Sequence, residues 1–260
     1  MIAEIRRKLA ASGEPLPRAC KRETEADARW AGYADCTKCE NTGTASELRE
    51  DGWRIAVVCE CQAVRANFAR LDASGIRSSL ESLTFENYRA EHDWQEAAKS
   101  TAMGYCGGAG GWLFLGGQVG SGKTHLGTAV LGQFVRKFAV RYMLWRDEIV
   151  KIKANVNNDP EYQALVYPLK AVDVLYVDDF FKTERNSGKR ELPTAADVKF
   201  AHELLNYRYV EKKRTIISSE LFIDDILEID EAVGSRIYQM SKGHCVEIGY
   251  DKNKNWRLRT

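Results

Sequence analysis

Apolar and polar positions along the carboxyl half of the chain follow an alternating strand and helix pattern. Apolar runs of strand length occupy 111–115, 140–145, 172–178, 214–219 and 244–249. Apolar positions at helical spacing occupy 123–137, 195–210 and 223–240, and Thr194 with Asp197 forms a capping signal for the second of these helices. Strands separated by helices pair in parallel and are covered on both faces. The pattern predicts an α/β fold with a five-stranded parallel sheet.

The amino-terminal third has a different pattern. Residues 54–58 read as a strand, and residues 62–82 carry helical spacing that is interrupted by a turn at Ser74 and Gly75. This segment is too small to bury a large core, so we expect it to need a metal for stability. The pattern predicts three parts: a small domain over 1–75, a linker over 76–90, and the α/β domain over 91–260.

A glycine-rich segment between the first strand and the first helix carries the most specific signal. Residues 117–124 fit the phosphate-loop pattern Gly-x-x-x-x-Gly-Lys-Thr completely. Such a loop points backbone N–H groups at phosphate oxygens, and the helix that follows presents its positive end to the same anion. We expect Lys123 at the β- and γ-phosphates of ATP and the Thr124 hydroxyl on Mg²⁺. The predicted nucleotide-binding residues are Gly117, Gln118, Val119, Gly120, Ser121, Gly122, Lys123, Thr124 and His125.

Two acids, Asp178 and Asp179, end the strand predicted at 172–178. A phosphate-loop site needs a carboxylate at the end of a neighbouring strand to hold Mg²⁺. We expect Asp178 to bind the ion through its water shell and Asp179 to polarise the attacking water. The strand at 214–219 is followed by Glu220, whose side chain is placed to orient that water.

Two groups of residues are open to either a contact with single-stranded DNA or a structural role. Phe180 and Phe181 would stack on bases if exposed and would belong to the core if buried. Lys182 opens a polar segment, 182–192, that we expect to be a mobile loop beside the site. The same two interpretations, a DNA track or an ordinary helix surface, apply to Arg136, Lys137, Arg141, Arg146, Lys151 and Lys153.

Four of the seven cysteines form two close pairs, Cys36 with Cys39 and Cys59 with Cys61, separated by the length of one hairpin. Zn²⁺ takes four ligands at tetrahedral corners, and two pairs on tight turns supply four thiolates. We predict a structural zinc site, with scattered buried thiols as the alternative. The cysteines without a partner at ligand spacing are expected to be small buried side chains, although Cys20 could replace a member of the cluster. They are Cys20, Cys106 and Cys245.

Composition places the chain among globular proteins. Its 260 residues are 44% hydrophobic, and 38 Lys and Arg nearly balance 37 Asp and Glu to give a net charge of +1. The apolar runs fall short of the roughly 20 residues of a membrane helix, and the amino terminus leads into no stretch of signal-peptide length. We therefore expect a cytoplasmic protein without a membrane partner. The small net charge argues against bulk nucleic-acid binding, although a local basic groove is compatible with it.

With these motifs, residues 80–260 resemble the AAA+ ATPases, and within them the bacterial and phage replicative helicase loaders of the DnaC/DnaI type. The segment 83–88 is similar to a box that lies near the adenine in that family, which implies nucleotide contacts for Phe85 and Asn87. Residues 177–180 match the family's double aspartate. The segment 215–219 resembles its sensor-1 strand, with Ser219 and Glu220 where many members have Asn.

Two further segments extend the resemblance. Residues 234–237 are similar to the family's arginine-finger segment, which implies that Arg236 reaches the nucleotide site of a neighbouring subunit. Residues 255–257 match the family's closing Asn-Tyr-Arg with Trp in place of Tyr, which implies a nucleotide-sensing role for Arg257. Residues 1–75 look like the cysteine-bearing region that grips the helicase in related loaders.

The resemblance implies an ATPase that loads a replicative helicase onto single-stranded DNA, with hydrolysis timing its release. It implies ATP, Mg²⁺ and Zn²⁺ as cofactors, and a hexameric helicase, single-stranded DNA and further copies of this chain as partners. Two other functions are compatible with the sequence: a transposition-helper ATPase of the IstB kind, and a nucleotide-gated adaptor with negligible hydrolysis. The implied catalytic residues are Lys123, Asp178, Asp179 and Arg236.

Overall fold

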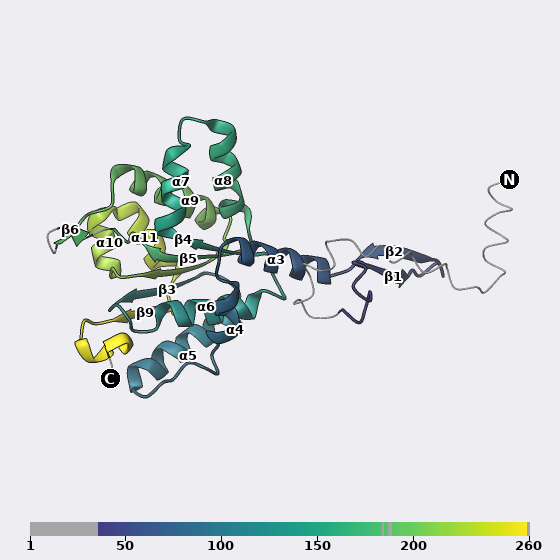
Figure 1. Ribbon diagram of the computed structural model, residues 1–260, viewed down its shortest axis with the longest axis horizontal. Coiled ribbons are helices and arrows are strands. Elements are labelled where there is room, and N and C mark those ends of the chain that lie inside the picture. Colours follow the sequence, from purple (N-terminus) through teal and green to yellow (C-terminus); the bar gives the residue numbers. More distant parts are fainter. Residues whose placement is uncertain (1–35, 184, 187–188, 259–260) are drawn as a thin grey trace.

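A five-stranded parallel sheet forms the centre of the molecule (Figure 1). The computed structural model describes residues 36–183, 185–186 and 189–258. The strand order is β4-β5-β8-β3-β9, and neighbouring strands pair in parallel. The predicted α/β fold and its five-stranded parallel sheet are therefore confirmed. The strands are β3 (Trp112–Gly117), β4 (Val140–Leu144), β5 (Val174–Phe180), β8 (Arg214–Ser219) and β9 (Cys245–Ile248).

Helices cover both faces of the sheet because successive strand residues point to opposite sides. In β3, Trp112 and Phe114 join one core cluster, whereas Leu113 and Leu115 join the other. One face carries α3 (Cys61–Ala73), α4 (Arg77–Ser82), α5 (Asp93–Gly107) and α6 (Lys123–Phe134). The other carries α7 (Trp145–Ala154), α8 (Asp159–Ala171), α9 (Ala195–Val210), α10 (Ile223–Ile229) and α11 (Glu231–Met240).

Several elements differ from the sequence prediction. The helix predicted at 223–240 is two helices, because the Asp230 carboxylate accepts a hydrogen bond from the Val233 N–H at 2.8 Å and starts α11. The predicted capping at Thr194 is confirmed, because its hydroxyl accepts a hydrogen bond from the Asp197 N–H at 3.3 Å. In return, the Thr194 N–H donates to Asp197 Oδ2 at 2.8 Å. The sequence pattern missed α5, α7 and α8. Helix α5, for example, buries mostly small or polar residues, which give little apolar periodicity: Gln95, Ala98, Ala102 and Tyr105.

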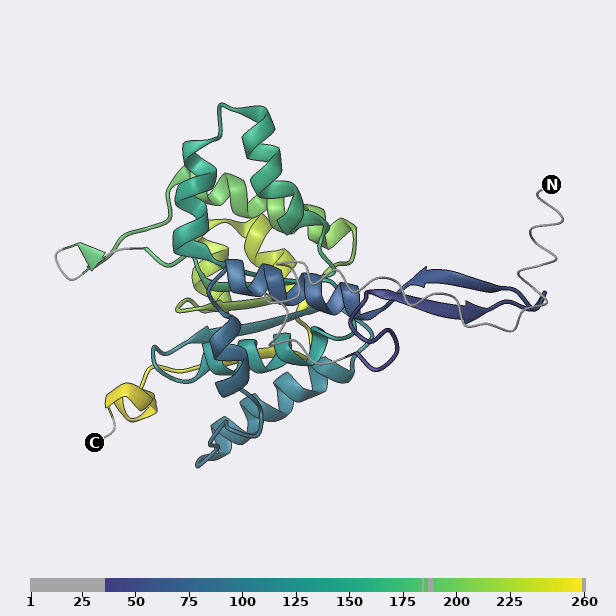
Figure 2. The ribbon, with the colours of Figure 1, turned by 45° about the vertical axis from the view of Figure 1, so that its right-hand side comes forward.

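Residues 36–60 form an arm that projects from the α/β layers (Figures 1 and 2). Its strands, β1 (Thr44–Leu48) and β2 (Arg54–Val58), pair antiparallel, with Thr44 opposite Val58. The hairpin expected between the two cysteine pairs is therefore present. Both pairs lie at the end of the hairpin that joins α3.

Helix α3 connects the arm to the sheet and is buried against it. Asn67 is 1% exposed, and its Nδ2 donates to the carbonyl oxygens of Val135 and Phe138, each at 2.7 Å. Its Oδ1 accepts a hydrogen bond from the Val140 N–H at 2.9 Å. Leu71 is fully buried in the same cluster as Leu113. Residues 61–73 thus pack as part of the α/β layers, while the boundaries proposed at residues 75 and 90 stay predictions.

A fully buried arginine, Arg208 of α9, holds three elements together. Its Nη1 donates to the carbonyls of Leu169 and Val172 at 2.9 Å, where α8 ends, and its Nε donates to Thr215 Oγ1 of β8 at 3.0 Å. The carbonyls at the end of a helix lack partners within the helix. Burial lowers the pKa of Arg208 to about 9. Its side chain is therefore a structural cap rather than a surface charge.

The described part of the segment 182–192 includes regular secondary structure, and the mobility expected of this segment stays a prediction. It contains a short antiparallel pair, β6 (Arg185–Asn186) and β7 (Lys189–Arg190). The chain then closes with β9 and two short 3-10 turns, η1 (Lys252–Lys254) and η2 (Trp256–Leu258). Within the described ranges, no helix is both long enough and apolar enough to cross a membrane.

Candidate functional site

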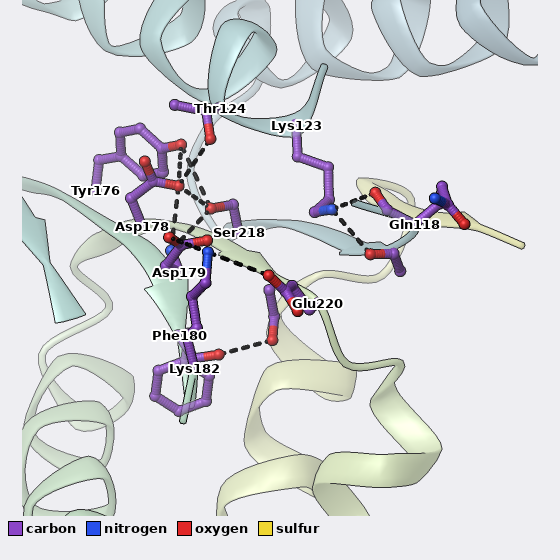
Figure 3. Close-up of polar contacts among 12 residues, drawn as sticks. Gln118, Lys123, Thr124, Tyr176, Asp178, Asp179, Phe180, Lys182, Ser218 and Glu220 are labelled. Carbon is purple, nitrogen blue, oxygen red and sulfur yellow. Dashed lines mark hydrogen bonds and ion pairs between the residues drawn. The ribbon is translucent and has the colours of Figure 1, made fainter. Parts of the chain in front are cut away.

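The phosphate loop lies where β3 ends and α6 begins, at the carboxyl edge of the sheet. Its glycines are required by shape. Gly117 has a φ of +98°, and a Cβ there would lie 2.2 Å from the Ile248 carbonyl oxygen. The Lys123 ammonium folds back onto the loop, donating to the carbonyls of Gly117 at 2.8 Å and Gln118 at 2.6 Å (Figure 3). The loop therefore has the predicted form, with its lysine held by backbone oxygens.

Lys123 shares its surroundings with three acids. Its side chain is 8% exposed, and this burial lowers the pKa of the ammonium to about 8. The carboxylates of Glu220, Asp179 and Asp178 oppose that shift, in this order of strength. The predicted acids on β5 and the acid after β8 therefore lie close enough to Lys123 to act on its charge.

Asp178, 3% exposed, is the point where four elements meet. Its Oδ2 accepts a hydrogen bond from the Tyr142 hydroxyl of β4 at 3.0 Å. Its Oδ1 accepts from Thr124 of α6 at 3.2 Å and from Tyr176 of β5 at 2.9 Å (Figure 3). The Ser218 hydroxyl of β8 and the Asp179 N–H also donate to Oδ1. The carboxylate is thus fixed beside Thr124, as expected of a pair that holds one Mg²⁺.

Sequence reasoning missed Tyr142, Tyr176 and Ser218. Tyr176 precedes Asp178 by two residues and so shares its face of β5. Tyr142 and Ser218 belong to strands on either side of β5, and only the pairing register brings them to Asp178. Burial raises the pKa of both tyrosines, so their hydroxyls stay protonated donors. The alternation of side chains along β5 could have identified Tyr176 from the sequence, but no sequence pattern identifies Tyr142 or Ser218.

A bulge in β5 turns Asp179 away from the path of the strand. The pairing with β8 shifts between Val177 and Phe180, and Asp179 has a φ of +55°. Its carboxylate lies 2.9 Å from the Lys182 ammonium, which also lies 3.1 Å from Glu220 Oε1. Asp179 and Glu220 therefore share one cation (Figure 3).

The aromatic pair and the serine at this edge of the sheet are all buried. Phe180 and Phe181 are each 1% exposed, and both rings pack against Trp145. The interpretation that they stack on DNA bases is therefore wrong, and the core interpretation is correct. Ser219 is turned to the backbone, donating to the Phe180 carbonyl at 2.7 Å. The hydroxyl of β8 that contacts the acidic pair is that of Ser218, and the nucleotide role of Ser219 stays a prediction.

The predicted adenine-side box, residues 83–88, packs against the first turn of α6. His125 Nε2 lies 2.7 Å from the Thr84 carbonyl oxygen, and the Tyr88 ring meets the His125 ring edge-on at 5.1 Å. Phe85 is buried in the core, whereas Asn87 is exposed. The structure thus brings the box beside the phosphate loop, and the adenine contacts of Phe85 and Asn87 stay predictions.

The closing segment crosses the phosphate loop from the other side. The Trp256 N–H donates to the Gly120 carbonyl at 2.8 Å, and the Asp251 N–H donates to Gln118 Oε1 at 3.2 Å. Asn255 packs so closely that a Cβ on Gly120 would lie 1.9 Å from its Oδ1. Arg257, which follows Trp256, is exposed, and its nucleotide-sensing role stays a prediction.

Arg236 lies on α11 and contacts α9 of its own chain. Its Nε donates to Asn206 Oδ1 at 3.1 Å, and its Nη1 donates to the Ala232 carbonyl at 2.6 Å. The guanidinium also lies 5.7 Å from the centre of the Tyr209 ring. The structure therefore places it in an intrachain cluster, and its action on a neighbouring subunit stays a prediction.

Some of the basic residues that could form a DNA track are paired with acids of this chain. Lys151 pairs with Glu148 at 2.7 Å, and Lys153 pairs with Asp197 at 2.9 Å. Arg141 belongs to β4, whereas Arg146 belongs to α7. These pairings favour an ordinary helix surface over a continuous DNA track.

The four paired cysteines come together at the base of the arm. Their sulfur atoms all lie within 4.8 Å of one another, with Cys36 Sγ 3.6 Å from Cys59 Sγ and Cys39 Sγ 3.5 Å from Cys61 Sγ. Burial and the neighbouring thiols raise the pKa of Cys61 to about 12. For Cys39, burial acts in the same direction but the Gly43 N–H and the other three cysteines outweigh it, lowering the pKa to about 6.

This pattern is that of crowded thiols that cannot all ionise without a cation, and four sulfurs at this separation fit a tetrahedral Zn²⁺. Of the remaining cysteines, Cys106 is half-buried and Cys245 is exposed, so the expectation that both are buried is wrong. Cys20 lies outside the described residues.

Comparisons with solved structures show which proteins share this fold. No family model matches the chain. The solved DnaC helicase loader matches 65% of this chain and 98% of its own at a TM-score of 0.53 and 23% identity. DnaI matches 65% and 92% at 0.51 and 18% identity, and AMPPCP-bound DnaA from Aquifex aeolicus matches 67% and 52% at 0.52 and 22% identity. The chain shares the fold of these three proteins, and the resemblance to DnaC and DnaI is confirmed at the level of the fold.

Two proteins of Bacillus subtilis (strain 168) define the family. The chain is 37% identical over 222 residues to the uncharacterized protein YqaM, covering 79% of this chain and 68% of YqaM. It is 33% identical over 232 residues to the phage-like element PBSX protein XkdC, covering 84% of each. The chain belongs to the family of YqaM and XkdC.

Burial of Lys123 predicts a pH-dependent stability. Its pKa is about 8 in the folded chain against an ordinary value of 10.5, so the unfolded chain binds more protons between these pH values. Stability contributed by this residue therefore rises with pH across the window. Relative to Lys123→Met, we expect the native chain to gain about 2 kcal/mol in free energy of unfolding between about pH 7.5 and pH 9.5. Urea unfolding followed by circular dichroism measures this, and a difference that does not change with pH would contradict it.

Proposed function

We propose that the chain is an ATP-dependent helicase loader, which binds a replicative DNA helicase and helps to place it on single-stranded DNA. The observation that carries this proposal is the phosphate loop with Lys123 facing three acids, on a fold shared with the DnaC helicase loader. Among the described residues, buried Lys123 forms hydrogen bonds to two carbonyl oxygens and to no carboxylate. A nucleotide site explains this arrangement, because the ammonium is then available to phosphate oxygens.

In this proposal the chain's own groups share the work of binding and hydrolysis. Lys123 exchanges the carbonyls of Gly117 and Gln118 for the β- and γ-phosphates of ATP. Thr124 and Asp178, 3.2 Å apart between Oγ1 and Oδ1, hold Mg²⁺, which neutralises phosphate charge when bound. Asp179 polarises the attacking water, and Glu220, which shares a cation with it, helps to orient that water.

The remaining nucleotide contacts are assigned by position and by the resemblance. The box at 83–88 and the segment at 255–257 flank the phosphate loop, so we place Phe85 and Asn87 on the adenine side and Arg257 at the phosphates. Arg236 would act on the nucleotide of a neighbouring subunit. That step requires it to leave Asn206, and it makes self-association part of the proposal.

The arm is the part we assign to the helicase. Four cysteines at its base hold a structural Zn²⁺, and the hairpin beyond them exposes Leu48 and Trp53, at 66% and 58%. Because α3 is buried against the sheet through Asn67, we place the seam between arm and ATPase at residue 60 and keep α3 with the ATPase. Movement of the ATPase layers would then be passed to the arm through α3.

A nucleotide-gated adaptor with little hydrolysis is the second candidate. One contact favours it. The carboxylate of Asp179, which is expected to act on water, is instead paired with the Lys182 ammonium. Binding of ATP without turnover would fit this arrangement, and the phosphate-release assay that follows separates the two.

Phosphate release from ATP, with and without single-stranded DNA, tests the enzyme. We expect Lys123→Ala to lower the rate by at least about 100-fold, because it removes the cation that stabilises the transferring phosphoryl group. The exposed Lys242 is the matched control, and Lys242→Ala should leave the rate unchanged. Equal release by the native chain and Lys123→Ala would exclude hydrolysis at this site.

Metal analysis of gently purified protein tests the arm. We expect about one zinc per chain, lost in Cys59→Ser because a three-thiolate site is incomplete. Cys106→Ser is the matched control, since this thiol bonds the Ala102 carbonyl within α5. Retention of zinc by Cys59→Ser, or the absence of zinc from the native chain, would exclude a structural zinc held by these four cysteines.

A further inference from the structure

Among the described residues, Lys182 is the one cation that pairs with both Asp179 and Glu220, the two acids proposed to act on the attacking water. Its ammonium lies 2.9 Å from Asp179 Oδ2 and 3.1 Å from Glu220 Oε1 (Figure 3). All three side chains are partly buried, at 29%, 29% and 12% exposed for Lys182, Asp179 and Glu220. Pairs in such surroundings are screened less by solvent than pairs at the surface.

We propose that Lys182 is a positioning residue that restrains hydrolysis, by holding Asp179 and Glu220 in an ion-paired resting arrangement. The proposal rests on the proposed hydrolysis of ATP at this site. A carboxylate that accepts a charge-assisted hydrogen bond is a weaker proton acceptor than a free one. While Lys182 stays in place, Asp179 is therefore poorly suited to polarise water, and turnover is slow.

The backbone keeps Lys182 within reach of both acids. Asp179 and Phe181 have φ values of +55° and +56°, a conformation that residues other than glycine rarely adopt. The Phe181 ring is 1% exposed and stacks on Phe180 at 4.1 Å between centroids, which fixes the turn. The Lys182 N–H closes the turn on the Asp179 carbonyl at 3.0 Å. Lys182 is thus aimed at the acids by a tight, buried turn.

A second position for the ammonium is also available. Lys182 lines a cavity of about 640 Å³ between α7 and the segment leading to α9. Asp147 and Glu191 line the same cavity, as do Arg146 and Lys151, and Asp197 there is paired with Lys153. A lysine that leaves Asp179 therefore enters a cavity with charges of both signs, which includes acids. The restraint can therefore be released by rotation of one side chain, without movement of the sheet.

The test is steady-state ATP hydrolysis by Lys182→Met, which removes the charge and keeps most of the side-chain volume. We expect kcat to rise about threefold to tenfold, a small part of what a general base contributes, with KM for ATP unchanged within about twofold. Lys182→Arg keeps the cation and should restore the native rate. Lys151→Met is the matched control, because Lys151 lies on the same cavity but pairs with Glu148.

The outcomes separate this proposal from the proposed function. If native hydrolysis depends on Lys123 and Lys182→Met is no faster than Lys151→Met, the restraint is wrong and the ATPase stands. A fall in kcat would also overturn it, and would indicate that Lys182 acts on the triphosphate instead. If neither protein releases phosphate, the restraint fails, and a fluorescent ATP analogue then shows whether nucleotide binding fails too. Should Lys182→Met melt early, Lys182→Gln repeats the comparison.

Discussion

The hydrogen bonding of one carboxylate, that of Asp178, organises the carboxyl edge of the sheet. Donors from β4, β5, β8 and α6 converge on it: Tyr142, Tyr176, Ser218 and Thr124. A buried carboxylate is costly unless its oxygens are paired, so each of these elements is held in register by that requirement. The same constraint explains Gly127 of α6, where a Cβ would lie 2.5 Å from Tyr176 Cζ. The helix that carries Lys123 and Thr124 can therefore approach the acids closely.

A second constraint joins this site to the arm. Asn67 bonds the chain where α6 gives way to β4, and α6 starts at the phosphate loop. The other end of α3 is Cys61, a member of the sulfur cluster. Two short, well-packed helices thus connect the phosphate loop to the sulfur cluster. In the proposed loader, this arrangement would pass a change at the phosphates to the arm without a flexible joint.

Much of this could be predicted from the sequence, and the rest depended on tertiary contacts. The phosphate loop, the acidic pair, the five strands and the cysteine pairs are local patterns whose residue types are dictated by chemistry. Tyr142 and Ser218 could not be found, because only strand register brings them to Asp178. Phe180 and Phe181 were ambiguous because exposure is a tertiary property, and Trp145 buries both. The predicted burial of Cys245 was wrong for the same reason, because this residue lies on the edge strand β9 and is exposed.

The central claim is that ATP-bound protein holds a replicative helicase through the arm. Co-purification with a hexameric replicative helicase, in the presence of a non-hydrolysable ATP analogue, tests it most directly. The account predicts capture of the full chain with the analogue, weaker capture with ADP, and loss of capture when residues 1–60 are removed and α3 is kept with its core contacts. Failure of the full chain to bind the helicase, or equal capture without residues 1–60, would contradict it.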